Sequence, residues 1–434
     1  MGQAISPGPA PQTPPAGGGG GTTLSFPNSP GSQSLPSTAS AAQTITLDEA
    51  IAMAQGSSPR LQGAAATAAR ATAAIRTARA YTNPNVEVYE GIQYGRAIAT
   101  PGIPGLLQHY AGTQAIEIPR ERRARVRAAQ LASTSSRFGE AAVTLSVVSD
   151  VKHAFYNVLL RREEIENQQE NLQLVEDLRR RVEVEVRVGE KGRLELTRAE
   201  AELAQARYTV RSAQIELSNA IALLRVVIAA PADANLNPAG TLEPPITLPP
   251  LAEARAQVLR THPAAAQSET DIEAARATLT HEQALRIPRP TLFGEFENQP
   301  DLRYWRAGVT IPIPLWDRRQ GQIGEATASI SQADAIFDQR RLELVSATER
   351  AYAQYQLADQ QASSLESGEL RAAESAVDAA KAAYRFGERG IVEVLDAQRV
   401  LQSVRGDLLD AQFARQSALT DLEELGAITP GGKP

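Results

Sequence analysis

The chain has 434 residues, of which 42% are apolar, and its 44 basic and 50 acidic residues leave a formal net charge of −6. A chain of this length can bury a substantial core. Its charge balance is mildly acidic, and it lacks the basic patch that nucleic-acid binding requires. Cysteine is absent, which excludes disulfides, thiolate metal sites and a lipidated cysteine. Apolar runs are too short for a transmembrane helix, which needs about 18 such residues.

The first 43 residues consist largely of Pro, Gly, Ser and Thr. Such a segment buries too little apolar surface to offset its ordering entropy, so we expect a disordered leader at 1–43. It lacks the basic start and apolar middle of a secretory signal, because the first basic residue of the whole chain is Arg60. We therefore expect no export signal here: either the protein is not exported or the signal has already been removed.

The rest of the chain repeats one layout. The first copy has a helix that is interrupted at Pro59 and ends at "NP", residues 83–84. The second copy has a helix that is interrupted at Pro263 and ends at "PRP", residues 288–290. This layout predicts an internal duplication, with a first repeat at 44–230 and a second at 251–428. The Pro-rich stretch 231–250 is the expected linker, and 429–434 is a short C-terminal tail.

A β-hairpin is expected in each repeat, at about 84–119 and about 289–314, where apolar and polar residues alternate with a period of two. In the last strand, Trp305, Ala307 and Val309 share one face, whereas Tyr304 and Arg306 share the other. Each hairpin therefore has one apolar side.

A long helical segment follows each hairpin, at roughly 120–188 and 317–386. About 68 helical residues would span on the order of 100 Å, more than a compact domain can hold. Each segment ends at a Gly-acid-base-Gly break, "GEKG" at 189–192 and "GERG" at 387–390. A second helix then carries an apolar seam with alternating spacings of three and four residues, which is typical of a coiled coil.

The breaks predict sharp reversals between paired antiparallel helices. Gly189 and Gly387 can adopt the left-handed conformation that ends a helix. Gly192 and Gly390 are expected to relieve the turn before the next helix begins.

Four strands per chain leave exposed sheet edges and cannot close around a lumen. Only a closed barrel can cross lipid with such strands, and three chains would supply twelve. We therefore expect a mixed α and β membrane protein, a homotrimer whose strands form a 12-stranded β-barrel.

Residues 44–428 resemble the TolC-like outer membrane efflux protein family. The duplicated layout and "GERGIVEVLDAQ" carry the resemblance, and "TLDEAIAMA", "NPNVEVYEG" and "VTIPIPLWDRRQGQI" look most like its CzcC-type heavy-metal efflux branch. The resemblance implies a trimeric channel in the outer membrane of a Gram-negative bacterium, in which the 12-stranded β-barrel continues into an α-helical barrel that extends into the periplasm. Its partners would be outer membrane lipid, a periplasmic membrane-fusion adaptor and an inner-membrane pump of the resistance-nodulation-division type.

The same resemblance implies that the tip turns form a periplasmic gate. Position by position, the acids of the gate match Glu393, Asp396 and Glu195, and its locking residues match Tyr384 and Arg389. Three copies of the acids around a narrow axis would favour cations. The alternative is that they are solvated acids in the first turn of a helix, where the helix dipole favours them anyway.

Two further groups lie near the strands. Trp305 and Trp316 are candidate membrane-interface aromatics, or they pack at the strand-to-helix junction. Five arginines crowd the start of the first long helix, where they contact lipid phosphates or form a solvated face: Arg120, Arg122, Arg123, Arg125 and Arg127.

Nothing in the sequence indicates an enzyme, a cofactor or a resident metal. The four histidines lack ligand spacing, and no phosphate loop or catalytic arrangement is visible. The expected function is the exit duct of a tripartite efflux system exporting heavy-metal cations. Two alternatives remain: a multidrug or type I secretion tunnel, and a soluble coiled-coil scaffold or periplasmic adaptor.

Overall fold

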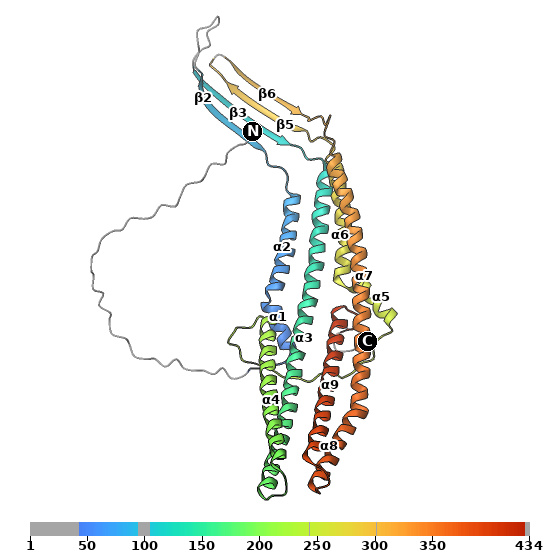
Figure 1. Ribbon diagram of the computed structural model, residues 1–434. Helices are drawn as coiled ribbons and strands as arrows, with labels where there is room; N and C mark the ends of the chain where they lie inside the picture. The colour runs from blue at the N-terminus through green and yellow to red at the C-terminus, as the bar shows by residue number, and fades with distance from the viewer. Residues whose placement is uncertain (1–42, 94–104, 243, 301, 430–434) are drawn as a thin grey trace, which may run out of the picture. The chain divides into compact units, whose positions relative to one another are not determined.

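The structure is a computed structural model that describes residues 43–93, 105–242, 244–300 and 302–429 (Figure 1). The expected leader at 1–43 and tail at 429–434 lie almost wholly outside these residues. The elements occur in the same order twice. The first series is α1 (Leu47–Ser57), α2 (Pro59–Arg79), β2 (Asn85–Gln93), β3 (Gly105–Ala115), α3 (Pro119–Arg187) and α4 (Arg193–Val227).

The second series differs in one respect, because its long helix is divided. It comprises α5 (Leu251–Thr261), α6 (Pro263–Ala284), β5 (Thr291–Asn298), β6 (Arg303–Thr310), α7 (Gln320–Ser364), the π-helix η1 (Leu365–Glu369), α8 (Leu370–Arg385) and α9 (Ile391–Glu424).

Local sequence explains where the helices begin. Thr46 and Glu49 form a capping box at the start of α1. Proline occupies the first turn of α2, α3 and α6, at Pro59, Pro119 and Pro263, where its missing N–H costs nothing. Pro59 separates α1 from α2, and Pro263 separates α5 from α6.

The two hairpins form a single antiparallel sheet in the order β2-β3-β5-β6 (Figure 1). One row across the four strands joins Val88, Tyr110, Phe296 and Trp305, and all four side chains are exposed. The neighbouring row lies on the opposite face and is polar: Tyr89, His109, Glu297 and Tyr304. The sheet thus has one apolar face that this chain does not cover.

A second, parallel pair of short strands was not predicted. β1 (Gln43–Ile45) pairs with β4 (Leu236–Pro238), so the linker returns to the start of the first repeat. Ile45 is buried there in a core with residues of α1, α3 and α4. Arg162 on α3 donates to the Pro238 carbonyl and to Asn237, which fixes the linker on the helix.

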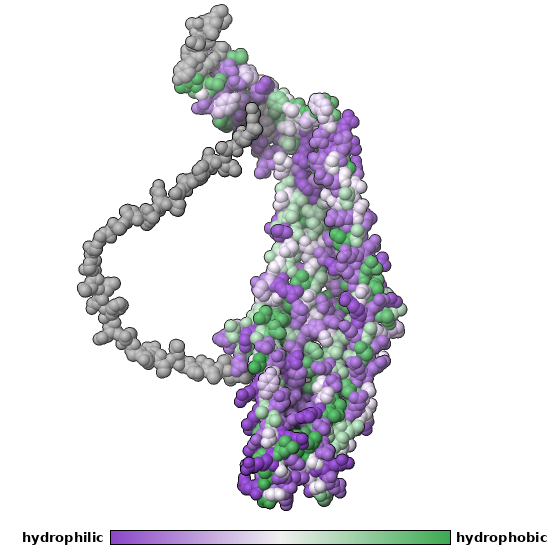
Figure 2. Space-filling model, viewed as in Figure 1, coloured by the Kyte–Doolittle hydropathy of each residue, from purple (hydrophilic) through white to green (hydrophobic). Residues whose placement is uncertain are grey.

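The described helices share several small cores instead of one large one. One core belongs to the first repeat and one to the second, and a third joins the two repeats near the tip turns. Figure 2 shows hydrophilic residues over much of the visible helical surface, with apolar patches between them. None of the helices in the described segments is both long and apolar enough to cross a membrane.

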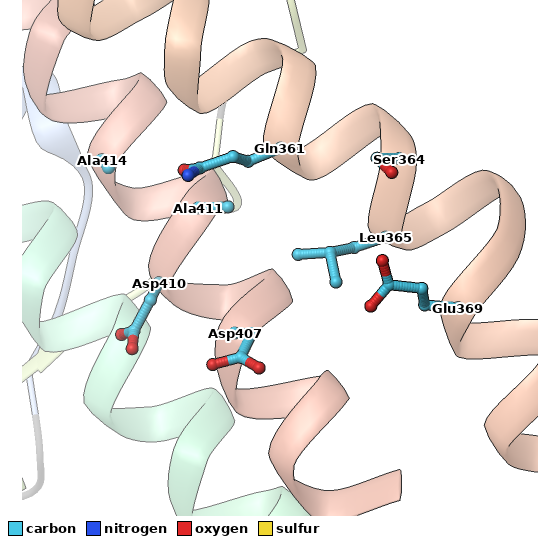
Figure 3. A pocket seen from close by; sticks show the side chains of 8 residues that line it. All are labelled: Gln361, Ser364, Leu365, Glu369, Asp407, Asp410, Ala411 and Ala414. Carbon is cyan, nitrogen blue, oxygen red and sulfur yellow. The ribbon is translucent and has the colours of Figure 1, made fainter. Parts of the chain in front are cut away.

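The π-helix η1 interrupts the helix expected at 317–386, which begins at Gln320. A hollow of about 510 Å³ lies between this turn and α9. Figure 3 shows Leu365 and Glu369 of the π-helix pointing toward α9, where Asp407 and Asp410 also line the hollow with their carboxylates directed away from the π-helix. Such turns contain one residue more than the α-helix they replace.

Candidate functional site at the tip turns

Both tip turns are built by the same hydrogen bonds. In the first, Gly189 N donates to the Val186 carbonyl at 3.2 Å and Glu190 N to the Glu185 carbonyl at 2.9 Å. In the second, Gly387 N donates to the Tyr384 carbonyl and Glu388 N to the Ala383 carbonyl. This pair of bonds is the Schellman motif, which ends a helix at a left-handed residue.

Only one glycine in each turn is required by the backbone. Gly189 and Gly387 have φ of 86° and 74°, in the left-handed region. Gly192 and Gly390 have φ of −85° and extended ψ, which any residue adopts, so their expected role in relieving the turn has no backbone basis.

Tyr384 ties the two tips of the chain together. Its hydroxyl donates to Glu185 Oε2 at 2.6 Å, joining α8 to α3. Burial, and then the hydrogen bond to Glu185, raise the pKa of the Tyr384 hydroxyl far above its usual range. The hydroxyl therefore stays a donor at any physiological pH.

An apolar core surrounds this bond and draws on both repeats. Only 6% of Tyr384 is exposed, and its ring lies in a cluster with Val182 of α3, Ala199 of α4 and Ile391 of α9. The Lys191 ammonium lies 5.8 Å from the ring centroid. The two tips of one chain are therefore packed against each other as well as hydrogen-bonded.

The two acids of the second tip lie on the exposed side of α9. Glu393 is in the first turn of this helix, with no ion pair among the described residues. Asp396 lies 3.3 Å from Arg399, and Arg399 also donates to Glu202 of α4 at 2.7 Å. Because the Asp396–Arg399 pair is largely solvent-exposed, it holds Asp396 only weakly.

Glu195 and Arg389 lie in different surroundings. Glu195 Oε2 is buried without a hydrogen-bond partner in the described structure, and its charge contributes to the raised pKa of Tyr384. Arg389 is exposed and forms no ion pair with any described residue. The structure thus brings Glu195, Tyr384 and Glu185 together and leaves Arg389 apart from them.

Sequence reasoning missed Glu185, Arg399 and Glu202. The repeat could not identify Glu185, because its counterpart 198 residues later is Ala383. Arg399 could have been found, since it lies three residues after Asp396 on the same helix.

The histidines take up separate positions. His109 stacks on Tyr89 in the sheet, His153 contacts Asp421, and His262 caps α6 by accepting from Ala264 N. Across the described segments, no three His, Asp or Glu side chains are arranged to hold a metal ion.

A family model for outer membrane efflux proteins matches residues 50–230 and 254–426, which span both repeats. The chain belongs to the outer membrane efflux protein family. This membership confirms the resemblance seen in the sequence. It places the protein in the outer membrane, extending into the periplasm, as an efflux channel and not an enzyme.

Individual relatives of the family are distant. The cobalt-zinc-cadmium resistance protein CzcC of Cupriavidus metallidurans is 24% identical over 392 residues, which cover 89% of this chain and 90% of CzcC. The pyoverdine export outer membrane protein OpmQ of Pseudomonas aeruginosa is 24% identical over 314 residues, covering 69% and 65%. The crystal structure of CusC matches with a TM-score of 0.76 at 20% identity, covering 89% of this chain and 95% of that one. This last similarity establishes the fold.

The two tryptophans of this efflux protein are both exposed. Trp305 lies on the apolar face of β6 with 77% of its surface accessible, and Trp316 lies between β6 and α7 with 88% accessible. Neither packs at the strand-to-helix junction within the chain.

Proposed function

We propose that this efflux protein is the trimeric exit duct of a tripartite system that exports heavy-metal cations, with the tip turns as its periplasmic gate. The uncovered apolar face of the β2-β3-β5-β6 sheet supports the trimer. Three such sheets would close a 12-stranded barrel whose apolar faces meet lipid. Trp305 and Trp316 would then lie at the membrane interfaces.

The bond from Tyr384 to Glu185 is the observation that carries the gate. It lies beside the apolar core that joins the two tip turns, so it stabilises one arrangement of the helix pairs. Glu393 and Asp396 are exposed close by on α9 and would face the axis in a trimer. Carboxylates in such a ring attract cations and repel anions. The negative charge of Glu195 helps to keep the Tyr384 hydroxyl protonated and therefore a donor to Glu185. Arg389 is free to pair with a neighbouring chain.

Exposed apolar side chains at the tips support docking of a periplasmic adaptor. Val188 and Leu194 flank the first turn, and Phe386 and Val392 flank the second. Phe386 is 81% exposed, which is unusual for an aromatic side chain without a partner. An adaptor that covers these residues would link the duct to an inner-membrane pump.

The similarity to CzcC over nine-tenths of both chains favours metal cations as the cargo. OpmQ, at the same identity over a shorter region, favours an exported small organic molecule as the second candidate. Resistance to Zn²⁺, Co²⁺ and Cd²⁺ in a strain lacking this protein separates the two. Unchanged metal tolerance would overturn the metal assignment and leave the duct assignment intact.

Replacing Glu393 and Asp396 with Ala tests the gate. Because the variant removes six carboxylates from the trimer, we expect altered single-channel conductance and weaker block by multivalent cations in planar bilayers. The matched control replaces Glu190 and Glu388, two acids within the tip turns themselves, and should leave block nearly unchanged. Equal block in wild type and the Glu393/Asp396 variant would remove both residues from the gate.

A further inference from the structure

The arginines at the start of α3 divide into two groups with different surroundings. Arg122 donates to the Arg79 carbonyl at 2.8 Å and covers the ring of Tyr81, and Arg125 donates to Ala78, Ala80 and Glu117. These two are used in holding α2 to α3. The other three, Arg120, Arg123 and Arg127, are exposed.

The exposed group lines one groove. Arg120, Arg123 and Arg127 border a hollow of about 500 Å³ between α3 and α6, with Thr280 at its rim. Its floor is formed by Ala124 and Ala277, which are 7% and 8% exposed. Three guanidinium groups therefore surround a shallow pocket with a small-residue floor.

Little within the chain neutralises these charges. Arg127 lies 3.6 Å from Glu273, and both side chains are more than half exposed. Arg120 and Arg123 form no ion pair or side-chain hydrogen bond with any residue that the structure describes. An exposed pair such as Arg127–Glu273 contributes little, so an anion with better geometry can replace Glu273.

The direction in which this groove faces follows from the seven-residue repeat of α3. Arg122 and Arg125 contact α2 near one end of α3, and Asp150 and Ser146, which bind Arg60, contact it further along. The separations, 122 to 150 and 125 to 146, are whole multiples of seven. The helix therefore keeps one face toward α2 over this length.

The same step of 28 residues carries Arg123 to Val151 and Arg127 to Phe155. Both are buried in the core that contains Ala50 and Ala54 of α1, and the linker passes over Phe155 near Gly240. In the proposed duct, α1 and the linker would block the bore if they lay inside it. The side of α3 that carries them, and with it the arginine groove, is therefore the outer side.

The groove also lies at the right depth for a lipid headgroup. β3 ends at Ala115, and exposed apolar side chains continue a few residues past the sheet, to Ile116 after β3 and to Trp316 after β6. The apolar band therefore ends just before Arg120. Arg127 is seven residues further, about 10 Å along the helix. Headgroup regions extend roughly 5–8 Å beyond the hydrocarbon core, so the backbone at Arg120 and Arg123 lies within them and that at Arg127 lies just outside. Helical side chains tilt toward the N-terminus of their helix, which is the membrane end of α3, so the Arg127 side chain points back toward the headgroups.

We propose that Arg120, Arg123 and Arg127 bind the phosphate of a phospholipid headgroup at the periplasmic surface of the outer membrane, one site per chain. Guanidinium groups bind phosphate oxygens in pairs, which favours Arg at such a site. This inference rests on the proposed trimeric duct, because the trimer defines the outer side.

The test measures phospholipid binding to the full-length protein in neutral detergent. The probes are phosphatidylglycerol, a galactosyl diacylglycerol with the same acyl chains but no phosphate, and inorganic phosphate. Native mass spectrometry should count one tightly bound phosphatidylglycerol per chain and none of the galactolipid. Displacement by millimolar inorganic phosphate would indicate a free-anion site and overturn the lipid assignment.

Substitutions then assign the site to the groove. Changing the three arginines to Gln should weaken phosphatidylglycerol binding about 100-fold, since each surface arginine contributes about fivefold. Arg123→Lys, which keeps the charge, should retain most of the affinity. The control changes Arg193, Arg198 and Arg211 on α4 to Gln and should bind like wild type. Equal binding by both triple variants would overturn the proposal.

This experiment is independent of gating. A protein that binds the lipid at the groove but neither trimerises nor conducts would disprove the proposed duct and leave the lipid site to be explained on a single chain. A conducting trimer without groove-dependent binding would disprove only the lipid site.

Discussion

The buried hydroxyl of Tyr384 should make the stability of the tips depend on pH. Its pKa in the folded protein lies above the value of about 10 for an exposed tyrosine, because burial and the bond to Glu185 favour the neutral form. A group with a raised folded pKa contributes stability below its unfolded pKa and loses it as pH rises toward the folded value. The tips should therefore weaken above about pH 10.

Replacing Tyr384 with Phe removes the hydroxyl while keeping the ring in its core. We expect a loss of roughly 1.5–3 kcal/mol from the closed tip, the range for a hydrogen bond to a charged group, and a higher open probability in bilayers. Above about pH 10 the melting temperature of wild type should fall further than that of the variant, because only wild type has the Tyr384 hydroxyl to ionise. If the melting temperatures of wild type and variant fell equally above about pH 10, ionisation of Tyr384 would not account for the alkaline loss of stability.

Among single residues, the sequence predicted Tyr384 but not the contact that it makes. The hydroxyl bonds to Glu185, which lies 199 positions away on another helix. Such a pairing depends on how α3 and α8 pack, and no local pattern encodes it. Asp396 was predicted from the family pattern alone, whereas its partner Arg399 follows from helical spacing.

The tip glycines offer a matched test at the level of elements. Gly189 and Gly387 have positive φ, and a methyl group added to either Cα would meet no other atom within 4 Å, so Ala there would suffer only backbone strain. We expect each Ala substitution to cost about 1–2 kcal/mol in thermal unfolding. Gly192→Ala, at an ordinary φ with open space, should be neutral or slightly stabilising. Equal effects at the two kinds of position would contradict this account.

The π-helix adjusts the phase of the buried seam. In α7 the buried residues alternate at spacings of four and three, from Leu344 to Ala362. Continued unchanged, this pattern would reach Ala383, yet the buried seam of α8 instead includes Tyr384. One extra residue in η1 accounts for the shift.

Deleting Gly368 from the π-helix should therefore be tolerated. The segment would become ordinary α-helix, and Tyr384 would keep its place against Glu185, with a melting temperature close to wild type. Deleting Ala376, an exposed residue of α8, should rotate Tyr384 by about 100° and lower the melting temperature strongly. A stable Ala376 deletion would show that the seam does not determine the packing.

Long, regular elements were the most predictable part of the fold. The helices and hairpins follow from periodicity, proline and glycine, as at Pro119 and Gly189. β1 and β4 are three residues each, too short for a periodic signal. Their pairing is set by packing of Ile45 in the first core.

Across the whole molecule, buried charges connect the two repeats. Glu121 of α3 is fully buried and accepts from Arg289 Nε at 2.8 Å, just before β5. Changing Arg289 to Met would leave a buried carboxylate with only the nearby Arg125, and we expect a loss of about 3–5 kcal/mol. Chemical unfolding of the purified protein measures this loss.

The control for Arg289 is Arg60→Gln. Arg60 pairs with Asp150 at a site where both side chains are about half exposed, so its loss should cost under about 1 kcal/mol. A similar loss in both variants would mean that burial does not determine the strength of these pairs. The duplication predicted both repeats but not these connections, because they join positions with no shared pattern.

The π-helix marks the point at which the two repeats differ in length by one residue. Ahead of it, buried positions of the two long helices correspond at an offset of 197 residues, as Val147 does to Leu344 and Ile165 to Ala362. Beyond it the offset is 198, as for Val175 and Ala373 or Gly189 and Gly387. A one-residue insertion in the second copy was thus absorbed within a single helical turn. The two tip turns therefore keep the same geometry, and the duplication can still be recognised in the sequence.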